Sequence, residues 1–144
     1  MDVSIREGSD AEYASQLTQS NMGEYYKDRK YVWDPYLFEE SWKAFSNCDV
    51  LLENSRVGII RFSYDESSTY IRDLQIEPPH QRKGIGRKCL DLAVNHAAIR
   101  RSKFLKLRVF PENPAVELYE RYGFKTISNN GAIIEMELNL DAIT

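Results

Sequence analysis

The feature that most constrains this chain is a short glycine loop placed between a strand pattern and a helix pattern. Residues 69–76 are rich in β-branched and aromatic side chains and alternate in polarity, which predicts a strand. The prolines at 78–79 end that strand, because proline cannot continue a β ladder. Over residues 85–101, apolar side chains recur at helical spacing. The sequence therefore predicts a strand, a loop at residues 81–86 and a helix, in that order.

The loop Gln81–Gly86 has the composition of an anion-binding site. Gly84 and Gly86 stand at the mouth of the predicted helix, where the absence of Cβ atoms lets backbone N–H groups converge on one anion. The helix dipole adds partial positive charge at the same end. Four basic side chains reinforce this charge, namely Arg82, Lys83, Arg87 and Lys88. We therefore predict a phosphate or pyrophosphate cradle.

Two common phosphate motifs do not fit this loop. A nucleotide P-loop has a Lys-Ser/Thr pair after its second glycine, whereas Arg87-Lys88 follow Gly86 here and offer no hydroxyl for magnesium. A dinucleotide fingerprint needs a third glycine, and this chain has Cys89 in its place. A nucleotide-phosphate binder of another kind stays open as an alternative.

Two segments together resemble one enzyme superfamily. The loop Gln81–Gly86 resembles the Q/R-x-x-G-x-G/A loop of the GNAT superfamily of N-acyltransferases, which binds the pyrophosphate of acetyl-CoA. The segment Asn113–Phe124 resembles the later N-P-A-x-x-L-Y-x-x-x-G-F helix and turn of the same superfamily. Both segments occur in the right order within a resemblance that spans about residues 57–138. The resemblance implies an acetyl-CoA-dependent N-acetyltransferase, with a non-catalytic CoA-binding sensor or interaction domain of the same fold as the alternative.

The expected architecture is a single α/β domain over residues 1–144. We expect a GNAT-like mixed, mostly antiparallel sheet of six or seven strands flanked by about four helices. The strand, helix, strand succession around the glycine loop implies a parallel crossover, and the resemblance implies that strands four and five are splayed apart. Ser9-Asp10-Ala11-Glu12 has the form of a capping box for a first helix that ends near Ser20. An exposed edge on the last strand, Ala132–Leu138, could support a homodimer.

The resemblance also implies how the cofactor is held. The pantetheine arm would pair with the backbone of Leu74, Gln75 and Ile76 on strand four. Asn113 would bind the pantetheine region, although its side chain could equally be a plain helix cap. The pyrophosphate would lie on the loop, whose binding residues are Gln81, Arg82, Lys83, Gly84, Ile85, Gly86 and Arg87.

Two side chains are candidates for proton transfer. The resemblance implies that Tyr119 protonates the leaving thiolate and contacts the cofactor, whereas its helical neighbours favour a core tyrosine. Asp73 is a candidate base for the attacking amine, and the alternative is a solubility charge on an edge strand. Some superfamily members have a glutamate on strand five, but the matching position here is Arg108.

The acceptor pocket is expected between the first two helices, where this chain is rich in aromatic residues. Tyr25, Tyr26 and Trp33 could stack on a cationic amine, and they could alternatively be core residues beneath a helix pair. We expect the acceptor to be a primary amine of a small molecule or a peptide.

Composition and charge exclude several other classes. With 42% hydrophobic and 28% charged residues, the chain is typical of a soluble globular protein. It contains no apolar run near the ~20 residues of a membrane span and no signal-peptide pattern, so we expect a cytoplasmic protein without membrane contact. The net charge of −3 argues against nucleic-acid binding. Cys48 and Cys89 form neither a disulfide framework nor a metal motif, so we expect two buried thiols and no metal.

Overall fold

The structure of the chain, a computed structural model, describes residues 1–143. Its contacts group the chain into two compact units. Unit 1 comprises residues 1–62 and 73–89, and unit 2 comprises residues 63–72 with the chain from Leu90 onward.

The described residues form one seven-stranded sheet in the order β1-β2-β3-β4-β5-β7-β6. The pair β4–β5 is parallel over Ser68–Ile71 and Phe104–Leu107, and the pairs β1–β2, β2–β3, β5–β7 and β6–β7 are antiparallel. This topology, with four α-helices, confirms the predicted fold class. The strands are β1 (Val3–Glu7), β2 (Ser46–Leu52), β3 (Ser55–Tyr64), β4 (Ser68–Ile76), β5 (Phe104–Val109), β6 (Lys125–Asn129) and β7 (Ile134–Asn139). The helices are α1 (Ala11–Asp28), α2 (Pro35–Ala44), α3 (Ile85–Ile99) and α4 (Ala115–Tyr122), with 3-10 turns η1 (Pro78–His80) and η2 (Leu140–Ile143).

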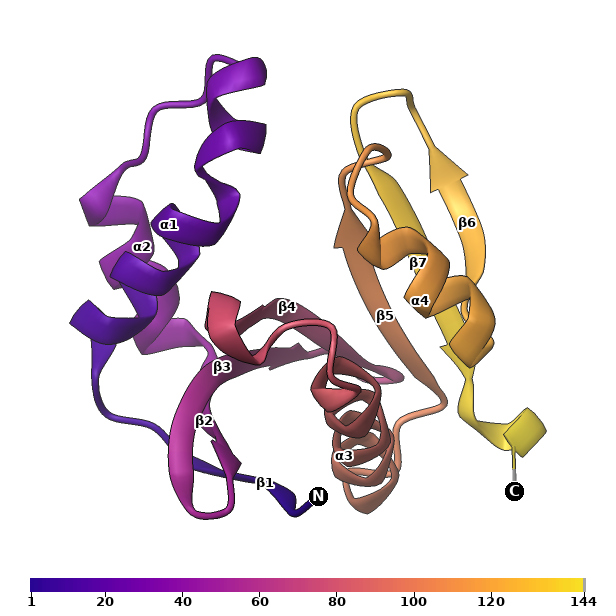
Figure 1. Cartoon of the computed structure of the whole chain (residues 1–144). Helices are drawn as coiled ribbons and strands as arrows, with labels where there is room; N and C mark the ends of the chain where they lie inside the picture. The colour runs from indigo at the N-terminus through magenta and orange to yellow at the C-terminus, as the bar shows by residue number, and fades with distance from the viewer. Residues whose placement is uncertain (144) are drawn as a thin grey trace. The chain divides into compact units, whose positions relative to one another are not determined.

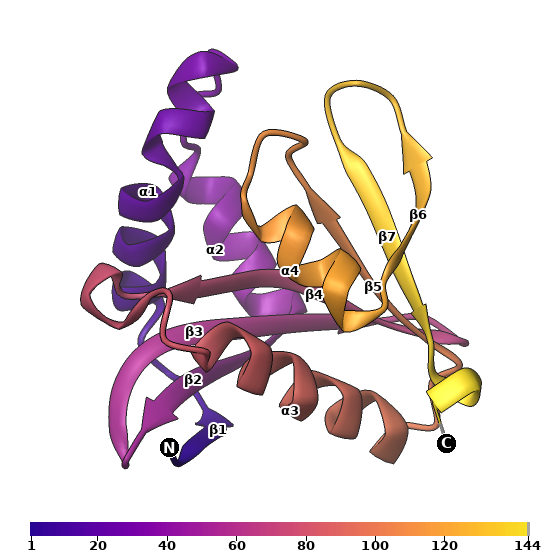
Figure 2. The same cartoon turned by 45° about the vertical axis from the view of Figure 1, so that its right-hand side comes forward.

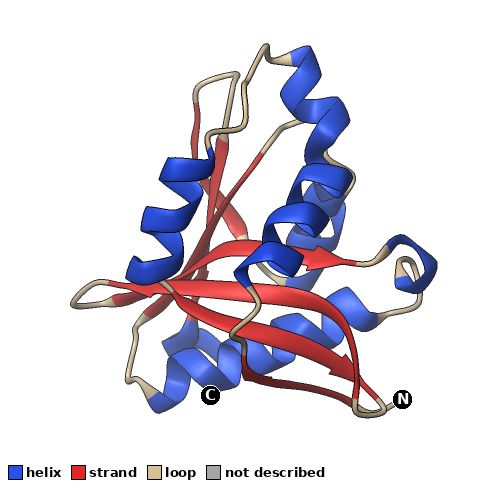
Figure 3. Cartoon of the chain, turned by 90° about the vertical axis from the view of Figure 1, so that its left-hand side faces the viewer, coloured by secondary structure: helices blue, strands red, loops and turns tan. Residues whose placement is uncertain are grey.

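Unit 1 is built on the hairpin β2–β3 and the helices α1 and α2, which lie side by side (Figures 1 and 2). The hairpin is long (Figure 3), and its turn at Glu53 and Asn54 uses two left-handed residues, with φ of 50° and 69°. Ala14 and Leu17 of α1 pack against Ile59 of β3 in a buried apolar cluster. This packing accounts for the apolar stripe of α1, because the helix buries one face and exposes the other.

The first helix differs from the prediction at both ends. It is capped by Asp10, not by Ser9, and the Asp10 carboxylate accepts a hydrogen bond from the Tyr13 amide at 3.0 Å. It continues to Asp28, well past the predicted end at Ser20. The side chain of Asn21 donates to the Ile76 carbonyl at 2.9 Å, so a tertiary contact supports a helical turn that the local pattern does not favour.

Unit 2 contains β5, β7 and β6 together with α4. Its core includes Leu105, Leu107, Phe124, Met136 and Leu138, all buried. In the pair β5–β7, inward-facing residues alternate with outward-facing charges, as expected for a sheet with one buried face.

The prediction of an exposed edge on the last strand is wrong. Strand β7 lies between β5 and β6, with both neighbours paired along it, so Ala132–Leu138 offers no free edge. The edge strand of this part of the sheet is β6, and all five of its residues are exposed. A homodimer through the last strand therefore loses its structural basis.

Candidate functional site

The glycine loop in unit 1 presents its backbone to solvent. Arg82 and Gly84 both adopt left-handed conformations, with φ of 60° and 85°. A Cβ built on Gly84 would meet only the Met1 methyl at 3.8 Å, so the space above the loop is open. Ile85, 1% exposed, anchors the first turn of α3 in the core. An open loop with basic side chains at a helix N-terminus fits a pyrophosphate group.

The loop is held against the end of β4 by side-chain amides. Gln81 donates to the Ile76 carbonyl at 2.9 Å, which brings the predicted loop and strand residues together. Asn21 of α1 donates to the same carbonyl at 2.9 Å and to the Gln75 side chain at 3.2 Å. A carbonyl oxygen has two lone pairs, so that of Ile76 is already fully engaged.

A glycine in β3 permits this arrangement of β4. A Cβ at Gly58 would collide with the Gln75 carbonyl oxygen and would lie 3.1 Å from the Ile76 Cα. No residue with a side chain fits there unless β4 moves. The Glu77 amide donates to the Val57 carbonyl at 2.8 Å, which ties the end of β4 to the same part of β3.

The predicted base Asp73 is buried, so the alternative of a solubility charge on an edge strand is wrong. Its side chain is 12% exposed and accepts hydrogen bonds from Thr18 at 3.0 Å and from Gln75 at 2.7 Å. A terminal nitrogen of Arg61 lies 3.8 Å from the Asp73 oxygen that accepts from Thr18. Burial raises the pKa of the Asp73 carboxyl, and the Gln75 hydrogen bond, the charge of Arg61 and the Thr18 hydrogen bond oppose that rise.

Sequence reasoning missed Arg61, whose side chain is 5% exposed. Its guanidinium donates to Asn47 at 2.9 Å and to Ser41 at 2.7 Å. Three rings surround it, with centroids between 4.7 and 5.6 Å from the guanidinium carbon: Phe38, Trp42 and Phe45. The signal in the sequence was one arginine in the apolar run of residues 57–62, all of which are buried. A charge at such a position indicates a buried partner.

The aromatic residues predicted for the acceptor pocket fall on the end of α1 and the segment after it. Tyr26 packs on Tyr31 at 4.8 Å and on Trp33 at 6.2 Å between ring centroids, and Trp33 packs on Phe38 at 5.2 Å. Burial and the nearby negative charge of Asp73 raise the pKa of Tyr26 to about 12. Tyr25 is half-buried on the same helix.

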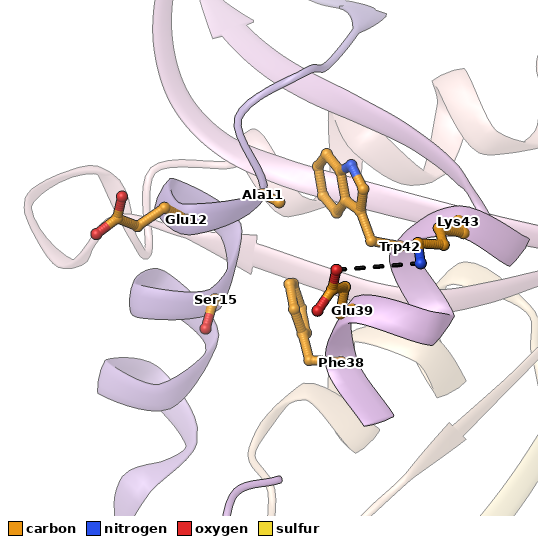
Figure 4. A pocket seen from close by; sticks show the side chains of 7 residues that line it. All are labelled: Ala11, Glu12, Ser15, Phe38, Glu39, Trp42 and Lys43. Atoms are coloured by element: carbon orange, nitrogen blue, oxygen red, sulfur yellow. Dashed lines mark ion pairs between the residues drawn. The ribbon is translucent and has the colours of Figure 1, made fainter. Parts of the chain in front are cut away.

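A groove of about 380 Å³ lies between α1 and α2 (Figure 4). Phe38 and Trp42 form its apolar side, and Lys43 pairs with Glu39 at 4.0 Å on its rim. Ala11, Glu12 and Ser15 line it from α1. The groove includes none of the residues predicted for cofactor, acceptor or catalysis.

Two predicted residues lie in unit 2. The Asn113 side chain accepts from the amide of Ala115, the first residue of α4, at 2.9 Å, while Pro114 occupies the N-cap position. Tyr119 is half-buried on α4 and packs edge-on against Phe124 at 5.8 Å between ring centroids. Arg108, at the position where some superfamily members have a glutamate, lies 3.9 Å from Glu135 on β7.

The remaining predictions concern metals, membranes and thiols. Within residues 1–143, no three His, Cys, Asp or Glu side chains gather as a metal site. None of the helices described here combines the length and apolar character required to cross a bilayer. Cys89 is buried as predicted, whereas Cys48 is partly exposed.

Comparisons with solved structures show which fold this is. PaiA N-acetyltransferase from Thermoplasma acidophilum, in complex with coenzyme A, has a TM-score of 0.75 at 17% identity, covering 96% of this chain and 99% of that one. A GNAT family acetyltransferase from Elizabethkingia anophelis with acetyl-CoA bound has a TM-score of 0.73 at 16% identity, with coverages of 95% and 97%. Spermidine N-acetyltransferase from Vibrio cholerae, in complex with CoA and spermine, has a TM-score of 0.75 at 23% identity and covers 96% of both chains.

A search of curated protein sequences found no match. The sequence model of the acetyltransferase (GNAT) family, in contrast, matches residues 13–124. That match contains the strand, the glycine loop and the α4 segment from which the resemblance was drawn. The chain therefore belongs to the acetyltransferase (GNAT) family.

Proposed function

We propose that this protein is an acetyl-CoA-dependent N-acetyltransferase that acetylates a primary amine of a small molecule or a peptide. The observation that carries the proposal is the open, basic glycine loop at the start of α3, in a chain of the acetyltransferase family. The solved relatives with bound CoA or acetyl-CoA support the choice of cofactor. We expect the protein to act in the cytoplasm as a single domain.

In this proposal, the loop holds the pyrophosphate through the backbone of residues 82–87, as the resemblance implies. The pantetheine arm pairs with the backbone at Leu74 and Gln75. At Ile76, a cofactor amide that used the carbonyl would have to displace Gln81 or Asn21, since both already donate to it. Asn113 contacts the pantetheine region in addition to accepting from the Ala115 amide at the start of α4.

The reaction requires two proton movements. The amine nitrogen attacks the thioester carbonyl, a C–N bond forms, and the C–S bond breaks. An alkylamine with a pKa near ~10.4 is mostly protonated at neutral pH, so a base has to remove its proton. We assign this role to Asp73, acting directly or through a water, because it adjoins the strand residues proposed to hold the cofactor and burial raises the pKa of its carboxyl, which makes it a stronger base. We assign protonation of the thiolate to Tyr119, because a phenol and a thiol have similar pKa values.

Calorimetry with a matched pair of glycine variants tests the cofactor site. Gly84→Glu places a negative side chain in the cradle and is expected to lower affinity for acetyl-CoA at least about 100-fold, a loss of about 2.7 kcal/mol or more. Gly131→Glu is the control, because Gly131 has the same φ of 85°, lies in open space and belongs to the exposed turn before β7. Equal binding by both variants, or no heat with wild-type protein, contradicts the cofactor assignment.

Turnover separates the enzyme from a non-catalytic CoA-binding domain. Release of CoA should be assayed with polyamines, amino acids, aminoglycosides and lysine peptides. Tyr119→Phe is expected to leave acetyl-CoA affinity nearly unchanged and to lower kcat by about 10²-fold or more, as for loss of a general acid. Tight acetyl-CoA binding without turnover of any amine would favour the non-catalytic alternative. Thermal stabilisation by ATP instead of acetyl-CoA would favour a nucleotide binder.

A further inference from the structure

The guanidinium of Arg61 makes several specific hydrogen bonds within unit 1, in addition to its packing contacts. Its Nε donates to Asn47 at 2.9 Å, and one terminal nitrogen donates to Ser41 at 2.7 Å. These partners are themselves fixed, since Ser41 donates to the Phe38 carbonyl at 2.7 Å and Asn47 donates to the Trp42 carbonyl at 2.8 Å. The planar guanidinium is therefore held in one orientation by Ser41 on α2 and Asn47 at the start of β2.

The fixed orientation directs the remaining end of the guanidinium at Asp73. The second terminal nitrogen of Arg61 lies 3.8 Å from one carboxylate oxygen of Asp73. Thr18 donates to that same oxygen, and Gln75 donates to the other. Three elements, namely α1, β3 and β4, thus converge on one carboxylate.

Stability alone does not account for such a pair. Removing both charges from water is costly, and replacing a buried ion pair with apolar residues is often neutral or stabilising. The three aromatic rings attract the guanidinium through their quadrupoles but carry no charge that could neutralise it, so the pair with Asp73 is a main electrostatic feature of this region. A function for the Asp73 charge would explain why the pair is present.

We propose that Arg61 is a positioning residue that keeps Asp73 ionised and oriented to accept the proton of the acceptor amine. The inference rests on the proposed function for its catalytic meaning, while the coupling between the two side chains can be measured without it. Arg61 itself touches no reacting atom. It acts through Asp73, and the residues that hold it, Ser41 on α2 and Asn47 on β2, act through Arg61.

The groups facing Asp73 determine the expected pH dependence. From β3 it faces the positive charge of Arg61, and from α1 it faces the hydroxyl of Thr18 and the phenol of Tyr26, whose pKa it raises. From its own strand it faces the neutral amide of Gln75. Arg61 is the cation in this set, so removing it should shift the titration of Asp73 to higher pH.

The test compares wild-type protein with Arg61→Met, Arg61→Lys and Arg56→Met. Carbon NMR of the Asp73 carboxyl is expected to titrate about 1–3 pH units higher in Arg61→Met, as for loss of an adjacent opposite charge. Arg61→Lys keeps the charge, so its titration should stay within about half a unit of wild type. Arg56 is the matched control, because it lies on the same strand with a different aspartate and a different ring as partners.

Kinetics extend the test to the reaction. In Arg61→Met, the acid limb of the kcat/KM profile should shift to higher pH by the same amount as the NMR titration. At alkaline pH, kcat/KM should recover. A folded Arg61→Met whose carboxyl titrates like wild type overturns the proposal. A shifted NMR titration with an unshifted acid limb also overturns it, because Asp73 would then not be the base. If wild-type protein turns over no amine, the proposed function fails, while the NMR titration still decides the coupling.

A further variant covers the case in which Arg61→Met does not fold. Recovery of folding in the double variant Arg61→Met/Asp73→Asn would show that the uncompensated carboxylate caused the loss, which supports the pairing. Failure of the double variant as well would show that α2 needs Arg61 independently of Asp73, and that result overturns the proposal.

Discussion

Strand β3 carries two arginines, each beside an aspartate and aromatic side chains, and the two ion pairs differ in burial. Arg56 and Asp10 are 31% and 47% exposed, whereas Arg61 and Asp73 are 5% and 12% exposed. The exposed pair is the closer one, at 3.2 Å against 3.8 Å. Water screens the attraction between Arg56 and Asp10. We therefore expect the electrostatic attraction between Arg61 and Asp73 to be the stronger one, although their distance is longer. Distance alone is therefore a poor guide to the importance of an ion pair.

The two aspartates also respond to their surroundings in opposite directions. The pKa of Asp10 is lowered, chiefly because the Tyr13 amide donates to its carboxylate at the start of α1. The pKa of Asp73 is raised, chiefly because burial disfavours its charge. A position at a helix cap and a position in a buried ion pair thus shift the pKa of the same kind of side chain in opposite directions.

The largest effect is expected from breaking the buried pair. Arg61→Met leaves the Asp73 carboxylate buried without its cation, so the free energy of unfolding should fall by about 3–5 kcal/mol. Urea unfolding monitored by circular dichroism measures this. Arg56→Met, the exposed counterpart, should change the melting temperature by less than about 2 °C.

Replacing both members of the buried pair sharpens the comparison. Arg61→Met/Asp73→Leu should recover most of the stability lost in the single variant, because neither charge is left buried. Equal losses for Arg61→Met and Arg56→Met would show that burial does not separate the two pairs.

The second effect concerns the glycine between the two arginines on β3. Gly58→Ala forces a methyl group into the Gln75 carbonyl, so β4 has to move and the free energy of unfolding should fall by about 1–3 kcal/mol. Gly23→Ala is a suitable control, because a Cβ at that helical position meets no atom within 4 Å beyond its chain neighbours and the adjacent helix backbone. A stable Gly58→Ala protein with unchanged acetyl-CoA affinity would mean that the close approach of β3 to β4 does not position the strand.

The third effect is a pH dependence that Asp73 should impose on stability. Because its folded pKa lies above the unfolded value near 3.8, its contribution is present at low pH and is lost as pH rises through the folded pKa. Relative to Asp73→Asn, the wild type should lose up to about 1.4 kcal/mol per pH unit across that window. Melting curves of both proteins from pH 3.5 to 8 measure the difference. A constant difference across this range would contradict the raised pKa.

The smallest effect is expected at the cap. Asp10→Ala removes the acceptor for the Tyr13 amide and should lower the melting temperature by about 2–4 °C at neutral pH. Asp10→Asn keeps the cap without the charge and should lose less. The pKa of Asp10 is lowered, so the advantage of the wild type over Asp10→Ala is present above pH 3.8 and disappears as pH falls through the folded pKa. The contribution of Asp10 to stability should therefore rise with pH, whereas that of Asp73 should fall with pH. This opposite pH dependence is the most direct test of the comparison.

The sequence was most informative where local pattern and fold agree. The helix after the glycine loop was predicted closely because an apolar stripe, two glycines and a preceding strand all indicate the same boundaries. The end of α1 was predicted too early, because residues 21–28 carry few apolar side chains and depend on contacts such as that from Asn21 to Ile76.

Strand order and buried charge depend on tertiary structure that periodicity does not encode. The sequence predicted a last strand at Ala132–Leu138, but its local pattern could not show that β7 lies inside the sheet and β6 at its edge. Asp73 was selected by its place beside strand residues expected to bind the cofactor. Its partner Arg61 is 12 positions away along the chain on another strand, and nothing in the local pattern pairs them.

The different environments of the two thiols have a practical consequence for measuring turnover. Cys89 is inaccessible on the first turns of α3, and burial raises the pKa of its thiol to about 12. Cys48 is partly accessible, and burial also raises the pKa of its thiol, so little reactive thiolate is present at neutral pH. A chromogenic disulfide reagent that reports released CoA should therefore show a slow background from one protein thiol. Cys48→Ser should remove most of that background.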